Sequence, residues 1–189
     1  MLAPPAFSDS PPFTLPLNEI PFDNPVLSGN KALNLAMAGQ KLKLPIPKGF
    51  VITTNAFYHF IEFNNLRKSI DDILARIDIA VISSLDDAAG KLVEKIMGAL
   101  IPPDIEKVIL DTFNSFEWDG KGDVRLALRS SAVAEDSQSS FAGQYRTVLN
   151  VAKDEIINAY KAVIASKYCA SALFYRISYG LSDIETPMA

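Results

Sequence analysis

Two short segments of the 189-residue chain carry residue types that suit the binding of phosphate groups. The first is Ser28-Gly29-Asn30-Lys31, which opens a stretch with apolar residues at helical spacing. A glycine turn at the start of a helix presents unpaired backbone N–H groups and the positive end of the helix dipole, and both attract anions. Lys31 adds a positive charge that can reach the same anion. The alternative is an ordinary helix start with a solvated lysine, since the spacing is not that of a Walker P-loop.

The second segment, residues 125–144, leads from a predicted strand into a loop of hydroxyl and small residues. Apolar residues alternate over 124–128, which predicts a strand that delivers Arg129 to its end. An arginine can bind two oxygens of one phosphate, and Ser130 and Gly143 lie in the loop that would close over a nucleotide. The alternative is a solvated hairpin loop with a surface arginine.

Few other side chains have the chemistry for a site. Glu135 and Asp136 could hold the arginine in place or attract Mg²⁺, or they could be ordinary surface charges. The single histidine, His59, falls in a predicted amphipathic helix over 55–63, where a partly buried or surface histidine is expected. The single cysteine, Cys169, excludes an internal disulfide and a CxxC zinc site, and it fits a reducing compartment.

Composition limits the classes of protein to which the chain can belong. It has 18 Lys and Arg against 22 Asp and Glu, a net charge of −4, so it lacks the basic field of a nucleic-acid binder. Apolar residues make up 49%, which excludes global disorder, and the length suffices for one sizeable core. No apolar run approaches the ~18 residues that span a bilayer. The sequence therefore predicts a cytoplasmic globular protein without a nucleic-acid or membrane partner.

The elements that must position these segments are mostly helical. Residues 1–15 are proline-rich and are expected to be an extended or disordered lead-in. Thr54 is expected to cap the helix that carries His59, and Gly180 to end the last helix. Helices are predicted at 30–40, 55–63, within 70–100, and at 103–116, 154–168 and 171–179, and strands at 49–53, 124–128 and 147–151. This pattern predicts an α+β fold that is helix-rich, with a small mixed or antiparallel sheet.

Several blocks of sequence resemble one known family. They read PLNEI at 16–20, LSGNKALNL at 27–35, LPIPKGFVITT at 44–54, LRSSAVAED at 128–136 and SFAGQ at 140–144. In this order they resemble the start of the nucleotide-binding domain of the phosphoenolpyruvate synthase and pyruvate phosphate dikinase family. That family has a Gly-Gly-Lys turn, a Pro-x-Pro-x-Gly-Phe segment, and a Val-Arg-Ser-Ser-Ala segment followed by Ser-Phe-Ala-Gly-Gln.

The resemblance implies an ATP-grasp-like nucleotide site, of which residues 16–189 would supply the N-terminal half. Lys31 and Arg129 match the family residues that contact the ATP phosphates, and they are the expected catalytic residues. The expected nucleotide-binding residues are Lys31, Arg129, Ser130, Gly143 and Thr147. The implied cofactors are ATP and Mg²⁺, with the Mg²⁺ ligands mainly in a downstream half and no metal site in this chain.

The implied reaction is a phosphotransfer that needs further domains. In related enzymes ATP phosphorylates a carrier histidine on another domain, which passes the phosphate to pyruvate, and the context of His59 does not match that histidine. Residues 186–189 resemble the lead-in to the family's next strand, so the chain is expected to be a part of a larger enzyme, or a naturally short relative, and to be inactive alone. Relatives with another acceptor, a rifamycin or a glucan, remain open, as does a non-catalytic interaction or regulatory module.

Two departures from the family pattern bear on the site. Asn30 replaces the second glycine of the turn, and asparagine tolerates a positive φ better than most residues. The loop between Asp136 and Ser140 is also shorter than the family pattern. The oligomeric state is not indicated by the sequence.

Overall fold

The computed structural model describes residues 12–118, 123–132 and 145–189. Glu135, Asp136 and Gly143 therefore lie outside the described residues, as does most of the proline-rich lead-in. The lead-in expected over 1–15 overlaps the first strand, which begins at Thr14.

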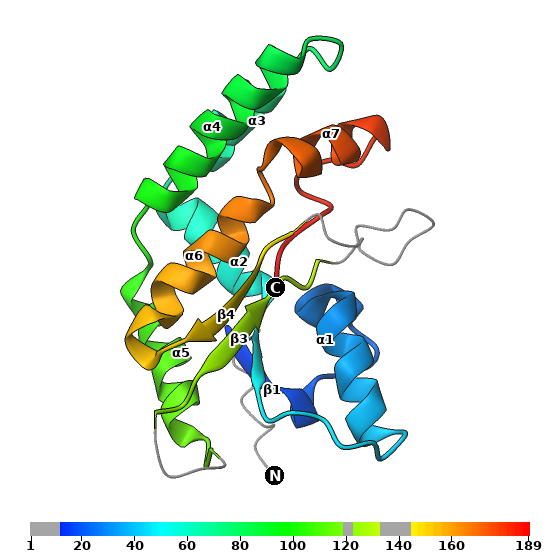
Figure 1. Cartoon of the computed structure of the whole chain (residues 1–189), viewed down its shortest axis with the longest axis vertical. Helices are drawn as coiled ribbons and strands as arrows, with labels where there is room; N and C mark the ends of the chain where they lie inside the picture. The colour runs from blue at the N-terminus through cyan, green and yellow to red at the C-terminus, as the bar shows by residue number, and fades with distance from the viewer. Residues whose placement is uncertain (1–11, 119–122, 133–144) are drawn as a thin grey trace, which may run out of the picture.

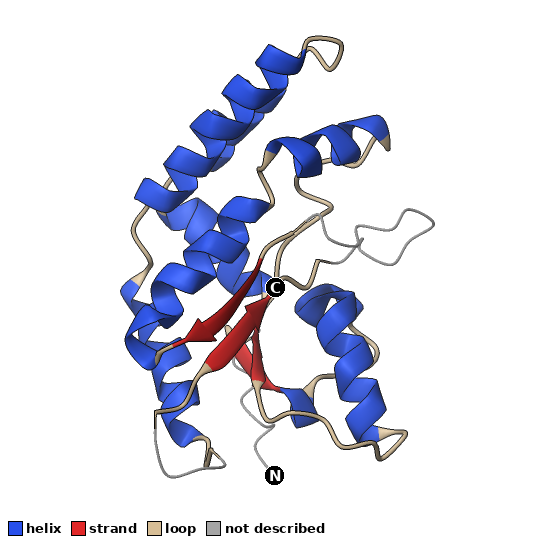
Figure 2. Ribbon diagram, in the orientation of Figure 1, coloured by secondary structure: helices blue, strands red, loops and turns tan. Residues whose placement is uncertain are grey.

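Helices make up most of the described chain (Figure 2). They are α1 (Pro25–Gln40), α2 (Thr54–Phe63), α3 (Arg67–Leu74), α4 (Ile82–Gly98), α5 (Pro103–Ser115), α6 (Ile156–Ser166) and α7 (Ala170–Ser178), with short 3₁₀ helices η1 (Leu17–Glu19) and η2 (Lys153–Glu155). The strands are β1 (Thr14–Pro16), β2 (Phe50–Ile52), β3 (Leu126–Arg129) and β4 (Thr147–Val151). The expected helix-rich α+β class is confirmed. In the described residues the strands form two separate sheets rather than one.

Both sheets are antiparallel pairs. β1 pairs with β2, so that the chain before η1 lies beside the strand that leads into α2. β3 pairs with β4, with Arg129 opposite Thr147 and Leu126 opposite Val151. The register shifts between Leu126 and Leu128, which marks an irregularity within the predicted alternation. Helix α6 packs against both β3 and β4 and covers this ladder (Figure 1).

The core is built from the apolar faces of the helices. The largest cluster joins α2, α4, α5, α6 and α7, and its fully buried members include Phe57, Phe60, Leu92, Ile105 and Ile109. Each such side chain contributes about 1.5–3 kcal/mol when it leaves water. A second, smaller cluster joins η1, α1 and β2 through Leu17, Ile20, Ala36 and Val51, and it includes Ala189 at the far end of the sequence. No helix among the described residues is long and apolar enough to cross a membrane.

The predicted capping role of Thr54 is wrong. The residue at the N-cap position of α2 is Thr53, and Thr54 already lies inside the helix. The Thr53 hydroxyl makes no capping hydrogen bond, because it donates to the Pro12 carbonyl at 2.6 Å. The Thr53 backbone N–H donates to the Phe13 carbonyl at 2.8 Å, so this residue ties the N-terminal segment to the start of α2.

The predicted role of Gly180 at the end of α7 is confirmed. Gly180 has a φ of +64°, which is the left-handed conformation that favours glycine. Its N–H donates to the Ile177 carbonyl at 3.1 Å, and the Leu181 N–H donates to the Arg176 carbonyl at 2.9 Å. These two bonds form a Schellman motif, which ends the helix and turns the chain towards residues 182–189.

Candidate functional site

Helix α1 is interrupted at Gly29. This residue has a φ of +68° and a ψ of 165°, so the chain makes a turn between a short first helical piece and the helix that continues to Gln40. A Cβ atom at Gly29 would lie 1.9 Å from the Ser131 carbonyl oxygen. Glycine is therefore required here for two reasons, the positive φ and the close approach of another backbone. The predicted glycine turn is confirmed.

The segment Ser130-Ser131-Ala132, directly after β3, lies against this turn. The Ser131 hydroxyl donates to the Ser28 carbonyl at 2.8 Å and accepts from the Ala32 N–H at 3.0 Å. The Asn30 N–H donates to the Ala132 carbonyl at 3.4 Å. The two segments singled out by the sequence are thus joined into one structure, although they lie about 100 residues apart.

These bonds correct one expectation about the turn. Its backbone N–H groups were expected to be unpaired and to attract an anion. The N–H groups of Asn30 and Ala32 instead donate to acceptors of the segment after β3. At Asn30 and Ala32 the backbone binds the two segments to each other, so these two N–H groups are not open to an anion.

The side chains of the candidate site meet in two pairs. Lys31 is half-buried, and its ammonium group donates to the hydroxyl of the buried Ser130 at 3.4 Å. Arg129 and Thr147 are exposed and directly opposite each other on β3 and β4, so their side chains share one face of the ladder. Gly143 is not described. Within the described residues, four of the five predicted site residues therefore lie in one connected region.

Arg129 differs from the other arginine near β3. No described residue makes a hydrogen bond or ion pair with the Arg129 guanidinium, and this side chain is exposed. Arg125 pairs with Asp123 at 2.6 Å and lies 3.9 Å from Glu155. Of these two cations, Arg129 is the one that can bind an external anion without first losing an ion pair to a described residue.

A third segment, which sequence reasoning did not place here, completes the region. Ser131 and Ala189 exchange two backbone hydrogen bonds, of 2.9 and 3.1 Å. Ala132 and Met188 form an antiparallel bridge beside them. Figure 1 shows the C-terminal end of the chain at the tip of β3, close to α1. Residues 186–189 are all buried, so this segment is part of the packed structure.

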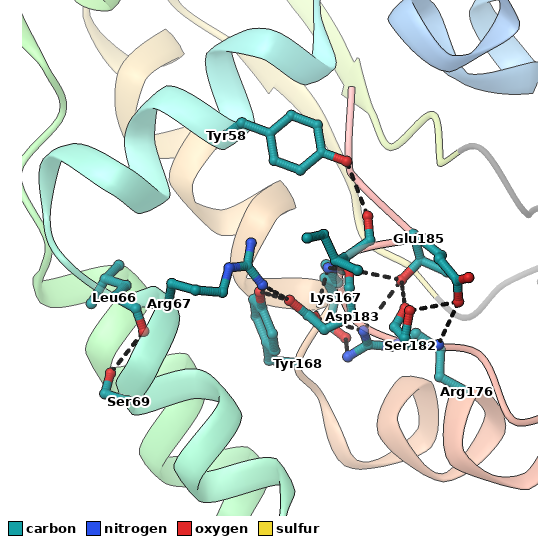
Figure 3. A network of polar contacts seen from close by, with 12 residues as sticks. Tyr58, Leu66, Arg67, Ser69, Lys167, Tyr168, Arg176, Ser182, Asp183 and Glu185 are labelled. Carbon is teal, nitrogen blue, oxygen red and sulfur yellow. Dashed lines mark hydrogen bonds and ion pairs between the residues drawn. The ribbon is translucent and has the colours of Figure 1, made fainter.

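A buried cluster of charges, which the sequence analysis missed, is centred on Asp183, three residues before Thr186. One oxygen of the Asp183 carboxylate accepts from Lys167 at 2.6 Å and from Arg176 at 2.7 Å, and the other accepts from Arg67 at 2.9 Å (Figure 3). The Tyr168 hydroxyl donates to the same carboxylate at 3.3 Å. A signal was present, because Arg176 falls on the buried stripe of α7 with Ala172 and Leu173.

Burial and charge shift the pKa values in this cluster. Burial, together with the nearby Arg176 and Arg67, lowers the pKa of Lys167 to about 7 despite the neighbouring carboxylate. Burial alone would raise the pKa of Asp183, but Lys167 and Arg176 hold it well below its ordinary value. Lysine is the cation in this cluster that can lose its proton, since arginine keeps its charge in proteins.

His59 has a structural environment, as expected for this helix. Its Nε2 lies 3.0 Å from a carboxylate oxygen of Asp104, and its ring stacks on Phe13 with 5.2 Å between centroids. The side chain is about one third exposed, which confirms the predicted partly buried or surface position. The described ranges contain no group of three or more His, Cys, Asp or Glu side chains that could hold a metal ion.

Comparison with known proteins identifies the family. Residues 26–189 match the family described as "Pyruvate phosphate dikinase, AMP/ATP-binding domain". The chain belongs to this family. It is 35% identical to the phosphoenolpyruvate synthase of Aquifex aeolicus over 179 residues, which cover 92% of this chain and 21% of that protein.

Two further relatives have similar coverage. The probable phosphoenolpyruvate synthase of Staphylothermus marinus is 35% identical over 94% of this chain and 22% of its own length. The probable phosphoenolpyruvate synthase of Methanocaldococcus jannaschii is 32% identical over 96% of this chain and 15% of its own length. The chain thus spans about a fifth, or less, of the curated relatives it matches.

The structure explains why the turn forms with Asn30 in place of the second glycine. The positive φ lies at Gly29, and Asn30 is not among the described non-glycine residues with positive φ, which are Lys43, Asn65 and Asn150. The tolerance of asparagine for that conformation is therefore not needed. A second glycine is not required for the turn of this member of the pyruvate phosphate dikinase AMP/ATP-binding family.

Proposed function

We propose that the chain is the N-terminal part of an ATP-grasp-like ATP-binding domain in a phosphoenolpyruvate synthase-like phosphotransferase. The observation that carries the proposal is the junction of the Gly29–Lys31 turn with the Arg129–Ser131 segment. It brings two cationic segments together at one place from distant parts of a chain whose net charge is −4. Membership of the AMP/ATP-binding family supports ATP as the ligand.

The cations and hydroxyls of the site have distinct roles in this proposal. Lys31 and Arg129 act as the catalytic residues by neutralising charge on the transferring phosphates, the main contribution a protein makes to phosphoryl transfer. Arg129 can bind two phosphate oxygens, whereas Lys31 acts as a point charge. The hydroxyls of Ser130 and Thr147 are close to these cations and can donate to phosphate oxygens. Gly143 belongs to the proposed covering loop.

Mg²⁺ belongs to the proposed reaction, but the described residues do not provide its site. Mg²⁺ prefers one or two carboxylates together with substrate phosphates, and no suitable cluster occurs in the described ranges. The proposal therefore assigns its ligands mainly to a downstream half of the domain. When bound, the ion would supply further positive charge at the phosphates.

The remaining steps involve parts of the protein beyond this chain. ATP phosphorylates a carrier histidine in another domain, and the phosphate passes from there to pyruvate. The names of the relatives support pyruvate as the acceptor. The proposal does not use His59 as the carrier, because its sequence context does not match that of the carrier histidine in the family. The proposal places the protein in the cytoplasm, and the lone Cys169 of this chain fits a reducing compartment.

One observation favours a second candidate, a non-catalytic module that keeps the fold. The N–H groups of Asn30 and Ala32 are bonded within the protein rather than open to a phosphate. Pyruvate-dependent consumption of ATP by the full-length protein distinguishes the two candidates. An enzyme shows it and a non-catalytic module does not.

Protection of Lys31 by ATP tests the proposed site. The full-length protein is labelled with an amine-reactive reagent, with and without ATP and Mg²⁺, and the modified lysines are quantified by mass spectrometry. Lys31 is expected to lose most of its labelling when ATP is bound. Lys68, exposed on α3, is the control and is expected to react equally in both samples. Equal labelling of Lys31 in both samples would overturn the proposed role of this residue.

A further inference from the structure

The buried charge cluster around Asp183 makes none of the proposed contacts with ATP, yet it joins several parts of the fold. Arg67 lies on α3, Lys167 follows α6 and Arg176 lies on α7. All three cations meet the one carboxylate of Asp183, on the segment that follows α7 (Figure 3). Lys167 is fully buried and Arg176 is 2% exposed. The carboxylate is therefore the point at which this segment is fixed to the helices.

The segment from Asp183 to Ala189 is tied at both of its ends. At its start, the Lys167 ammonium donates to both the side chain and the backbone carbonyl of Asp183, at 2.6 and 2.8 Å. At its end, Ala189 exchanges two backbone hydrogen bonds with Ser131. Ser131 is also the residue whose hydroxyl bonds to the Gly29–Lys31 turn on both sides, at Ser28 and Ala32.

The middle of the segment is also held in place, by hydrogen bonds and by burial. The Thr186 hydroxyl donates to the Ser182 carbonyl at 3.1 Å and is itself within 3.3 Å of an Arg176 guanidinium nitrogen. Residues 186–189 are buried, with Met188 only 1% exposed. The six peptide units from Asp183 to Ala189 span at most about 20 Å. Because the segment is packed, a displacement of Asp183 also displaces Ala189.

We propose that Asp183 is a positioning residue for the nucleotide site: it holds residues 183–189 in place, and through Ala189 it sets the position of the Arg129–Ser131 segment against the Lys31 turn. This inference rests on the proposed function of that site. Asp183 acts through backbone pairing and touches no phosphate itself. Without its carboxylate, three cations lose their common partner, and the segment keeps only the weaker contacts of Lys167 with the Asp183 carbonyl and of Arg176 with the Thr186 hydroxyl.

Two measurements on the full-length protein test this role. The first is amide hydrogen exchange at Ser131 and Ala189, which reports their mutual hydrogen bonds, and the second is the Kd for ATP with Mg²⁺. The variant is Asp183→Asn, which keeps the shape of the side chain and removes its charge. The control is Ile109→Val or Ile109→Ala, whichever has the same free energy of unfolding as Asp183→Asn. Ile109 is a buried residue of α5, far from the segment in sequence.

Asp183→Asn is expected to accelerate exchange of the Ser131 and Ala189 amides at least about tenfold over the matched Ile109 variant, because the opening is local. It is also expected to raise the Kd for ATP roughly tenfold, within the range that mispositioning of catalytic groups can cause. A general loss of stability would affect both variants equally. If Asp183→Asn does not fold, Thr186→Val, which removes a single hydroxyl from the segment, is expected to change both quantities in the same direction by a smaller factor.

Exchange at Ser131 no faster than in the matched Ile109 variant would overturn the inference. So would faster exchange combined with an ATP affinity equal to that of the Ile109 variant. If the wild-type protein binds no ATP, the proposed function fails and the positioning role fails with it. In that case exchange at Ser131 still shows whether Asp183 fixes the segment, so the two failures are distinguishable.

Discussion

At the scale of single residues, Gly29 is the position on which the candidate site depends most visibly. It combines a positive φ with a backbone approach that leaves no room for a Cβ atom. Ser131, on the other side of this approach, satisfies polar groups of Ser28 and Ala32 with one hydroxyl. The site is therefore assembled by backbone contact between two segments, and its cations are positioned as a result.

Gly29→Ala is expected to destabilise the protein by about 2–5 kcal/mol, since the strain of a positive φ adds to the collision with the Ser131 carbonyl. Gly90→Ala is the control, because Gly90 lies inside α4 and a Cβ atom there would meet nothing within 4 Å. That substitution is expected to stabilise the protein by about 0.5–1 kcal/mol. Urea unfolding measures both, and equal effects would contradict this account of Gly29.

Asp183→Asn is expected to lower the free energy of unfolding by about 3–5 kcal/mol near pH 6, because it leaves buried cations without their partner. The pKa of Asp183 is held below its ordinary value of 3.8, so its stabilising effect is present above that pH and is lost as the pH falls through the lower, folded-state pKa. The difference between wild type and variant should therefore narrow below about pH 4. A difference in unfolding free energy that is constant from pH 6 to pH 2 would contradict this interpretation.

At the scale of elements, much of the fold follows from local sequence. The strand predicted at 147–151 has the bounds of β4, and the helix predicted from Pro103 has the start of α5. Prolines, glycines and apolar periodicity mark these positions within a few residues of the element. Thr53, rather than Thr54, is the N-cap residue of α2, and its hydroxyl donates to the carbonyl of Pro12, a contact across 41 positions of sequence that no local pattern predicts.

The features that could not be predicted depend on long-range contacts. The bonds from Asn30 and Ala32 to the segment after β3 join residues about 100 positions apart, and no local pattern encodes them. The attachment of Ala189 to Ser131 is of the same kind. The candidate residues themselves were found through the resemblance of their sequence blocks to the family pattern, because lysine, arginine and glycine in these contexts also fit an ordinary helix start and a solvated loop.

Gly180→Ala tests the end of α7. The positive φ makes alanine unfavourable by about 1 kcal/mol, and a Cβ atom there would meet nothing within 4 Å. The expected loss of unfolding free energy is thus smaller than for Gly29→Ala, although both glycines have a similar φ. If the two substitutions have equal cost in thermal or urea unfolding, the close approach at Gly29 is not significant.

At the scale of the whole molecule, residues from the beginning, middle and end of the chain converge at one place. The Lys31 turn, the Arg129–Ser131 segment and residues 188–189 are all joined by hydrogen bonds, while α2 to α7 form most of the large core. Two cations, Lys31 and Arg129, therefore lie on joined segments of a chain whose net charge is −4. Membership of the AMP/ATP-binding family is the reason to propose that these two cations bind phosphate.

His59→Gln is expected to leave phosphate incorporation from labelled ATP into the full-length protein unchanged. His59 contacts Asp104 and stacks on Phe13, and it makes none of the proposed phosphate contacts. The cost in stability should be at most about 1 kcal/mol, as for other exposed ion pairs. Loss of incorporated phosphate in this variant would make His59 the carrier and would contradict the proposed route.

The most direct test of the central claim is calorimetric titration of the full-length protein with ATP and Mg²⁺, comparing Arg129→Ala with Arg125→Ala. Loss of a charge-assisted contact from Arg129 to phosphate should cost about 1.5–3 kcal/mol, which raises the Kd for ATP about 10- to 150-fold. Arg125, already paired with Asp123, should be replaceable without a change in Kd. Equal affinities of the two variants and the wild type for ATP would contradict the assignment of this site.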